Sequence, residues 1–225
     1  MIRWDEPGYA VAFTTRAGGV SDGVYASLNL GAGTGDDPVR VEENRRRACD
    51  AAGLDAARLS FNRQVHSTAV HRAGGRGVEG DGLWSDEPGE AMLAFSADCL
   101  PIAIARTDGE RRLSVLHAGW RGLAGGIVAA GVGAVGGETA AIVGPAIGPC
   151  CYEVGEEVSS LFDEDLTVNR KLDLWSAAER ALRAAGVRRV ERVDLCTRCH
   201  PELFFSHRRS GRARGVQGVI GALAG

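Results

Sequence analysis

The chain has few features of a nucleic-acid-binding, membrane or secreted protein. Lys171 is the only lysine among 26 basic residues, and with 29 acidic residues the formal net charge is −3, so no basic field favours nucleic acid. No apolar run approaches the roughly 20 residues that a membrane-spanning helix needs. Residues 1–5 lack the apolar stretch of a signal peptide. We expect a cytoplasmic protein, a monomer, that binds neither nucleic acid nor membranes.

The cysteines do not form the pattern of a disulfide scaffold, and in a reducing compartment we expect their thiols to stay reduced. Cys49 lies in a segment of helical character and is expected to pack in the core. Cys150 and Cys151 are adjacent, so we expect that they do not both face one site. Cys196 and Cys199 have C-x-x-C spacing, which is a weak signal without a second pair or a two-histidine motif. We interpret this spacing as incidental.

Short apolar runs alternate with amphipathic segments, and this pattern predicts a mixed α/β fold in one domain over residues 1–225. A helix is expected at 38–52, capped by Asp36 or Asp37, and a second at 174–185, ended by Gly186. A further helix is expected after the turn that follows His117. The expected strands cover residues 10–15, 59–65, 91–97, 101–105, 113–117, 140–143 and 187–195. Residues 15–37 form a long glycine-rich loop, and loops of that length are uncommon unless they serve a site.

Three polar residues interrupt or end apolar, strand-like runs. His66 follows one such run, Cys99 lies between two of them, and His117 ends the run that opens "SVLHAGWRGLAGG". Polar groups inside apolar strands carry a desolvation cost, so they are usually hydrogen-bonded, metal-bound or catalytic. Two imidazoles and a thiolate are good zinc ligands that leave a fourth position open. The same residues could instead form a cysteine–histidine nucleophile pair.

Several motifs resemble those of one family. "QVHS", "DGLWSDEPGEAMLAFSADCLPIAIA", "HAGWRG", "GPAIGPCCYEVGEEV" and "FFSHRRSGRARG" are similar to motifs of the YfiH family, also called the polyphenol oxidase or laccase-domain family, which includes purine nucleoside phosphorylases. "FTTRAGGVS" and "SLNLG" extend the resemblance over nearly the whole chain. It implies a single α/β domain arranged as a four-layer α/β/β/α sandwich with mixed sheets, related to a class of proposed cysteine hydrolases.

The resemblance also implies a metal site. The family's zinc ligands are the histidine of its QVH motif, the cysteine of its ADC motif and the histidine of its HAGWRG motif. These positions are His66, Cys99 and His117, the three residues singled out above, and they are our candidate catalytic residues. Asp98, beside the cysteine, is a further candidate that either orients a ligand histidine or acts as an acid or base.

Three more residues lie in matching motifs and are candidates for binding phosphate or substrate. They are Arg16, Asn29 and Arg121, and a guanidinium suits a phosphate because it can form two parallel hydrogen bonds. A surface or carbonyl-bonding role is the alternative for Arg121. The sequence departs from the family pattern at Ser67, where glycine is usual, and at His207, where tyrosine is usual.

The resemblance implies phosphorolysis of adenosine, inosine and guanosine to free base and ribose 1-phosphate. It also implies adenosine deaminase and S-methyl-5'-thioadenosine phosphorylase activity, and zinc can activate water for a deamination. One alternative is a copper-dependent polyphenol oxidoreductase (laccase) with Cu²⁺ at the same site. Four-electron reduction of dioxygen would need several copper sites, for which five histidines are few. A peptidoglycan-precursor editing hydrolase is the other alternative.

Overall fold

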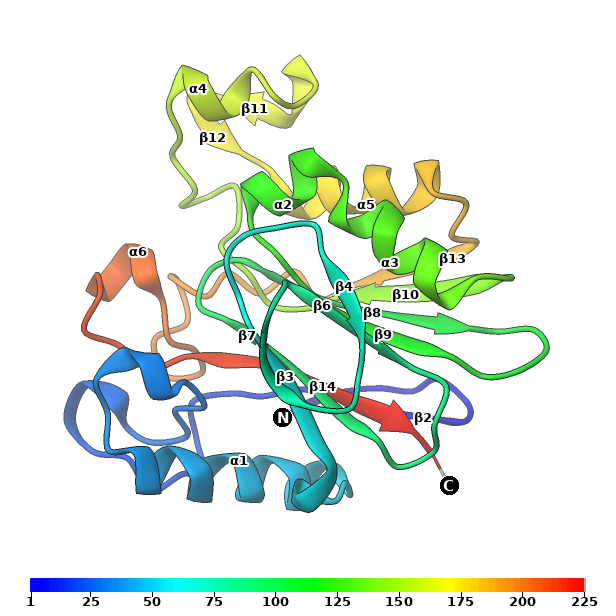
Figure 1. The fold of residues 1–225 in the computed structure, drawn as a ribbon. Helices are drawn as coiled ribbons and strands as arrows, with labels where there is room; N and C mark the ends of the chain where they lie inside the picture. The colour runs from blue at the N-terminus through cyan, green and yellow to red at the C-terminus, as the bar shows by residue number, and fades with distance from the viewer. Residues whose placement is uncertain (225) are drawn as a thin grey trace.

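Two mixed β-sheets form the centre of the computed structural model, which describes residues 1–224 (Figure 1). The first sheet has the strand order β1 (Ile2–Trp4), β2 (Tyr9–Phe13), β14 (Gln217–Leu223), β7 (Ala91–Ser96), β3 (Leu59–Arg63) and β5 (Arg76–Glu79). The second has the order β13 (Arg189–Arg192), β10 (Thr139–Val143), β8 (Leu100–Arg106), β9 (Leu113–Ala118), β6 (Gly82–Ser85) and β4 (Val70–Arg72).

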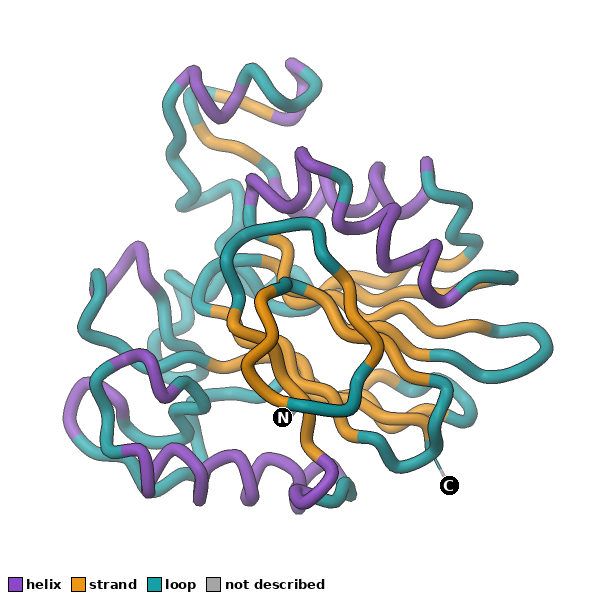
Figure 2. The backbone as a smooth tube through the Cα atoms, viewed as in Figure 1, coloured by secondary structure: helices purple, strands orange, loops and turns teal. Residues whose placement is uncertain are grey.

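Helices cover the outer face of each sheet, as Figure 2 shows. Helix α1 (Pro38–Ala52) packs on the first sheet through Ala48, Cys49 and Ala52. Helices α2 (Trp120–Gly125), α3 (Ile127–Val135) and α5 (Leu174–Ala184) pack on the second sheet. The predicted four-layer α/β/β/α sandwich is therefore confirmed. Shorter elements extend from it: α4 (Glu156–Ser159), β11 (Thr167–Val168), β12 (Lys171–Leu172) and α6 (His207–Ser210).

The interior between the two sheets combines large apolar side chains with alanines. Ala94 of the first sheet and Ala103, Ala105 and Ala140 of the second lie in the same buried cluster as Phe13. At Gly144 a Cβ atom would lie 2.2 Å from the Phe13 ring, so a side chain there would push the sheets apart. Burying such apolar surface contributes about 25 cal/mol per Å².

Most of the expected elements are present, with ends that differ by a few residues. Helix α1 has the predicted bounds because the Asp37 side chain accepts from the Val39 amide at its start, while Gly53 ends it in the left-handed conformation. Helix α5 ends one residue earlier than predicted, and the strand expected at 187–195 is limited to Arg189–Arg192. Strands β1, β4, β5, β6, β11, β12 and β14 were not predicted.

Candidate functional site

His66, Cys99 and His117 come together where strands of both sheets end. One potential ligand atom from each lies within 4.8 Å of the others, and Cys99 Sγ is 3.9 Å from His66 Nε2. The two imidazole rings meet edge to face, with centroids 4.9 Å apart. Three residues separated by up to 51 positions in the chain therefore form one cluster, as predicted.

Strand pairing explains this convergence. His66 follows β3, which pairs in parallel with β7 in the first sheet. Cys99 lies in the short connection from β7 to β8, and β8 pairs with β9 so that Pro101 is opposite His117. His66 and Asp98 lie where the chain leaves a strand. Both have a positive φ, 61° and 89°, which is uncommon outside glycine and allows the chain to turn sharply there.

Asp81 connects two of the three segments. Its buried carboxylate accepts hydrogen bonds from the backbone amides of Val65, His66 and Ser67, at 3.1, 3.0 and 2.7 Å, and from the Ser67 hydroxyl at 2.8 Å. It also lies 2.8 Å from His117 Nδ1. A histidine held in this way through Nδ1 presents Nε2 to a ligand, which is the usual arrangement around metal-binding histidines.

The structure corrects our hypothesis that Asp98 orients a ligand histidine. Asp98 Oδ1 accepts from the Thr197 hydroxyl and Oδ2 from the Arg208 amide, each at 2.6 Å. The histidine is instead held by Asp81, which sequence reasoning missed. The signal was available, because Asp81 opens the motif "DGLWSDEPGE", but nothing in the spacing placed it beside His117.

Cys99, His117 and Asp81 each stabilise the charged form of a neighbour in the cluster. Burial opposes the charged forms of both Cys99 and His117, yet their mutual attraction and hydrogen bonding outweigh it, and Asp81 adds to the effect at His117. The pKa of the Cys99 thiol is therefore lowered and the pKa of the His117 imidazole is raised. Burial also opposes ionisation of Asp81, but hydrogen bonds from His117 and Ser67 hold the pKa of its carboxyl below the usual range. The thiolate is the form of cysteine that binds metals and attacks electrophiles.

The donor set fits a zinc ion. Two imidazole nitrogens and a thiolate are typical zinc donors, and three protein ligands leave one coordination position open. Gly119 allows the ligands to meet, because a Cβ there would lie 2.8 Å from His66 Cδ2 and 3.1 Å from Cys99 Sγ. The exposed His66 lies at the mouth of the cluster, whereas His117 is buried.

A cleft of about 480 Å³ opens over the cluster. Its walls combine aromatic rings with arginines, as in sites for ligands that carry both an apolar ring and an anion. Arg121 lies on one wall, with its guanidinium 4.1 Å from the centre of the Trp120 ring. The other aromatic and basic lining residues are Phe95, Tyr152, His207, Arg208 and Arg214.

Arg214 is a second residue that sequence reasoning missed. It lies in "FFSHRRSGRARG", a motif whose sequence alone assigned no role to this arginine. Its Nε is buried without a hydrogen-bond partner in the described part of the chain, and its Nη1 donates to the Gly211 carbonyl. Burial lowers the pKa of Arg214, although the nearby Asp98 and Cys99 oppose this shift. A guanidinium with unused hydrogen-bonding capacity in a cleft can bind an anion.

Arg16 and Asn29 do not line this cleft, contrary to our expectation that they contact phosphate or substrate. The Arg16 guanidinium donates to the carbonyls of Ala26 and Pro201, at 2.7 to 2.9 Å. Asn29 is fully buried, and its side-chain amide bonds to Thr34 and Asp36. Both residues hold the loop at 15–37 in shape, which explains why polar residues are needed in these motifs.

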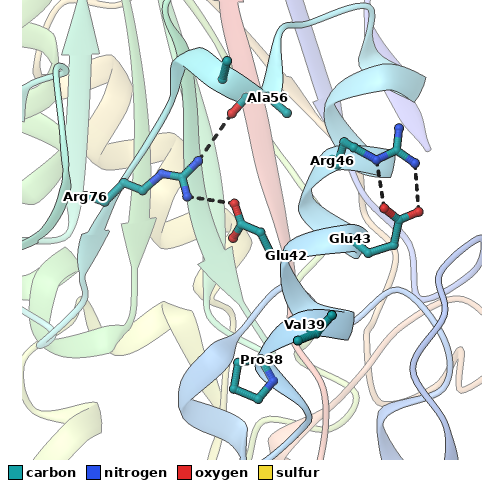
Figure 3. A pocket seen from close by; sticks show the side chains of 8 residues that line it. Pro38, Val39, Glu42, Glu43, Arg46, Ala56 and Arg76 are labelled. Atoms are coloured by element: carbon teal, nitrogen blue, oxygen red, sulfur yellow. Dashed lines mark hydrogen bonds and ion pairs between the residues drawn. The ribbon is translucent and has the colours of Figure 1, made fainter.

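A second depression lies along α1 and is shown in Figure 3. Its charged groups are paired with one another: Arg76 donates to Glu42 at 2.8 Å, and Arg46 to Glu43 at 2.8 Å. Because these charges neutralise each other at an open surface, the depression lacks the converging groups of a catalytic site.

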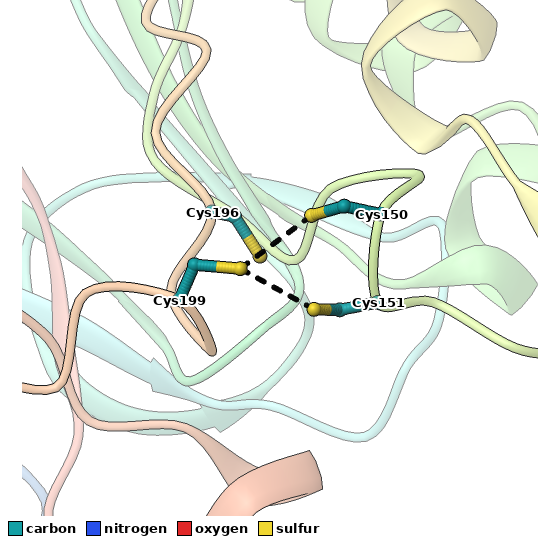
Figure 4. A group of neighbouring side chains, drawn as sticks. All are labelled: Cys150, Cys151, Cys196 and Cys199. Atoms are coloured by element: carbon teal, nitrogen blue, oxygen red, sulfur yellow. Dashed lines mark hydrogen bonds between the residues drawn. The ribbon is translucent and has the colours of Figure 1, made fainter.

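The structure also corrects our interpretation of the remaining cysteines. Cys150, Cys151, Cys196 and Cys199 lie together, with potential ligand atoms within 4.8 Å of one another (Figure 4). Cys150 and Cys151 both point into this group, because the chain turns tightly around them. The C-x-x-C pair thus has a second pair beside it, brought there from 45 or more positions away in the sequence.

The fold and the first cluster together define an α/β/β/α protein with a two-histidine, one-cysteine centre. Residues 10–223 match the family model described as multi-copper polyphenol oxidoreductase laccase. The chain belongs to this family, which we also refer to as the YfiH family.

Relatives and solved structures agree with this assignment. A purine nucleoside phosphorylase of Pseudomonas aeruginosa is 39% identical over 93% of this chain and 92% of its own length. The purine nucleoside phosphorylase YfiH of Escherichia coli is 36% identical over 92% of this chain and 91% of its own. The crystal structure of YlmD from Geobacillus stearothermophilus superposes with a TM-score of 0.88 at 32% identity, covering 97% of this chain and 93% of YlmD. A Neisseria meningitidis protein of family DUF152 gives a TM-score of 0.88 at 33% identity, covering 98% and 96%.

None of the helices formed by residues 1–224 combines the length and the apolar character needed to cross a membrane.

Proposed function

We propose that the protein is a zinc-dependent purine nucleoside phosphorylase that acts on adenosine, inosine and guanosine. The observation that carries this proposal is the His66–Cys99–His117 cluster at the base of a cleft whose walls hold Arg121 and Arg214. The curated relatives named purine nucleoside phosphorylase support the substrate class. The reaction would convert a nucleoside and phosphate to the free base and ribose 1-phosphate.

The cleft offers separate surfaces for the two substrates. Phe95, Trp120 and Tyr152 provide aromatic area against which a purine ring can pack. Arg121 and Arg214 can donate charge-assisted hydrogen bonds to phosphate, the group for which a planar guanidinium is best suited. Phosphate and nucleoside would thus be held side by side above the cluster.

Within the cluster each residue has a defined task. His66, Cys99 and His117 would hold the zinc ion, which when bound would supply a Lewis acid. Asp81 keeps the Nδ1 proton on His117 and orients the ring, so that Nε2 faces the cluster. Asp98 lines the cleft beside Cys99 and is our candidate for proton transfer, with Thr197 and the Arg208 amide fixing its carboxylate.

We include adenosine deamination and phosphorolysis of S-methyl-5'-thioadenosine in the proposal. In deamination water attacks C6 of the purine and ammonia leaves, whereas in phosphorolysis phosphate attacks C1' of the ribose and the base leaves. Both reactions would use the purine-binding wall, with the nucleoside placed so that a different carbon faces the cluster. They differ in their need for Arg121 and Arg214, and this difference makes the two activities separable by mutation.

The description of the family favours a second candidate, a copper-dependent polyphenol oxidoreductase. Two histidines and a cysteine are also the equatorial ligands of blue-copper sites, which add a weak axial methionine or glutamine. Met92 lies in the core between the sheets, and Gln64, which lines the cleft, spends both ends of its amide on the Phe95 backbone. Among residues 1–224 the other potential metal-binding group consists of cysteines alone. This arrangement supports zinc better than a multi-copper centre.

The experiment that tests the proposal is a nucleoside assay without oxygen. We expect purified protein under argon to release the base from inosine and adenosine only when phosphate is added, and to form ribose 1-phosphate. Cys99→Ala should lose this activity, whereas Cys49→Ala, which changes a cysteine in α1, should keep it. Turnover that requires dioxygen and added copper would overturn the proposal in favour of the oxidoreductase.

A further inference from the structure

The four-cysteine group is built by two turns at one edge of the second sheet. Strands β10 and β13 pair in parallel, so the segments that follow them leave the sheet at the same edge. Ala146 and Cys196 continue this pairing as a bridge beyond the strands. The turn at 148–152 then presents Cys150 and Cys151, and the turn at 196–200 presents Cys196 and Cys199 (Figure 4).

Hydrogen bonds fix both turns in the shape that brings the sulfurs together. The amides of Cys151 and Tyr152 donate to the Gly148 carbonyl at 2.9 and 3.0 Å. In the other turn, the amide of Cys199 donates to the Cys196 carbonyl at 3.1 Å. The Gly148 amide also points at Cys196 Sγ, at 3.3 Å. Amide donors directed at a cysteine sulfur are the kind of outer contact that supports metal-bound thiolates.

The spacing of the sulfurs matches a tetrahedral zinc site. Cys199 Sγ lies 3.4 Å from Cys151 Sγ and 3.6 Å from Cys150 Sγ. With Zn–S bonds of about 2.3 Å, tetrahedral geometry places neighbouring sulfurs roughly 3.8 Å apart. The thiols are free cysteines rather than disulfides. Cys196 is buried, whereas Cys150 and Cys199 are exposed, so an ion could reach the group from solvent.

We propose that Cys150, Cys151, Cys196 and Cys199 bind one structural zinc ion, separate from the ion held by His66, Cys99 and His117. Four protein ligands close the coordination sphere, so this ion would have no position for substrate. Its role would be to join the two turns. Arg209 holds one of these turns in shape, because its guanidinium donates to the carbonyls of Thr197 and Arg198 between Cys196 and Cys199.

The ion would also support the cleft without contacting substrate. Thr197, between Cys196 and Cys199, is fully buried and donates to Asp98 at 2.6 Å. Asp98 in turn precedes the ligand Cys99. The proposal stands independently of nucleoside chemistry, since it rests on the geometry of the cysteines alone.

Metal analysis of protein purified with reductant tests this proposal. We expect about two zinc ions per chain in the wild type, and about one in Cys99→Ala and in Cys150→Ser/Cys199→Ser, because each change removes one site. The control Cys49→Ala should retain both ions. Circular dichroism establishes that each variant is folded.

A second measurement does not depend on mutating the four cysteines. Cobalt(II) added to metal-free Cys99→Ala protein should give the intense thiolate-to-cobalt absorption and tetrahedral bands of a four-sulfur site. The signal should be lost when the four cysteines are first alkylated. The proposal is overturned if Cys99→Ala contains no zinc and gives no such bands, or if the four cysteines hold iron or form disulfides in the reduced preparation.

Discussion

At the scale of single residues, Asp81 has more influence on the site than its distance in sequence from His66 and His117 suggests. One carboxylate fixes the backbone that carries His66 and the ring of His117. The positions of both histidines therefore depend on this carboxylate. Its own hydrogen bonds are charge-assisted, and such bonds are about twice as strong as neutral ones.

Replacing Asp81 by asparagine should weaken metal binding by about ten- to a hundredfold, the usual cost of losing such a supporting contact. The amide removes the negative charge and turns an N–H₂ group toward N–H donors that then lack an acceptor. Competition with a chelator measures the affinity. Ser67→Ala is the matched control, because it removes the hydroxyl bonds to Asp81 at 2.8 Å and from the Ala69 amide at 3.3 Å and leaves the carboxylate in place. Equal affinity in Asp81→Asn and the wild type would contradict the role assigned to Asp81.

Arg121 is expected to bind phosphate. Charge-assisted hydrogen bonds contribute about 1.5 to 3 kcal/mol each, so Arg121→Ala should raise the KM for phosphate by about one to two powers of ten. Arg121→Lys should be almost as damaging, since it keeps the charge and loses the planar fork. Adenosine deamination and zinc content should change much less. Arg188→Ala serves as the control, because Arg188 is exposed and pairs with Glu138 outside the cleft. An equal loss of both activities would instead mark Arg121 as structural, or as a contact to the nucleoside.

At the scale of elements, the connection between β9 and α2 determines whether the ligands can meet. Gly119 forms this connection, and Gly119→Ala would place a methyl group against His66 and Cys99. We expect the zinc content of this first site to fall while the fold persists, because the added group meets ligand side chains at the surface of the sandwich.

Gly133→Ala is the matched control for that substitution. Gly133 lies in α3 with open space around its Cα, so the change should be neutral or stabilise by up to about 1 kcal/mol, the helix-propensity gain. Metal analysis and thermal unfolding of both variants provide the measurement. Full metal occupancy in Gly119→Ala would show that the cluster is looser than its geometry indicates.

The sequence predicts those helices and strands whose own residues favour the structure that the packed fold requires of them. Helix α1 has a capping aspartate, a proline in its first turn and a terminal glycine, so its bounds follow from local chemistry. The bounds of strand β14 do not follow from local chemistry, since Gly218 and Gly221 have low strand propensity. Glycine is required by a neighbour at position 218, where a Cβ would lie 2.2 Å from the Ala94 carbonyl oxygen. Such a demand comes from the packed sheet and cannot be read from the strand itself.

The same distinction applies to the candidate site. His66, Cys99 and His117 were predictable because polar residues inside apolar runs stand out, and the resemblance to a family selects the same three. Asp81 and the four cysteines were not predictable, since their partners are set by which strands pair. Arg16 and Asn29 show the opposite error: polar residues in a glycine-rich loop here shape the loop and do not face the cleft.

At the scale of the whole molecule, both proposed metal centres join segments that are distant in the chain. An ion bound only by the folded state stabilises it, by about 2.7 kcal/mol when free metal is a hundredfold above Kd. About 1 kcal/mol corresponds to a shift in Tm of roughly 2 to 4 °C for a chain of this size. Chelation should therefore lower Tm, as calorimetry with and without chelator will show. In Cys99→Ala/Cys199→Ser the chelator should have little effect, and an undiminished shift there would place the stabilising ion elsewhere.

The interior between the two sheets limits which substitutions can accumulate during evolution. His66 follows a strand of the first sheet and His117 ends a strand of the second, so a change in the spacing between the sheets would strain the Asp81 contacts that hold the two ligands together. A larger residue at Ala103 or Gly144 could leave a folded sandwich and still separate the two imidazoles. Substitutions in this interior are therefore restricted by the distance between the metal ligands as well as by the volume that a side chain can occupy. Residues remote from the cleft should tolerate fewer substitutions than the stability of the fold alone would demand.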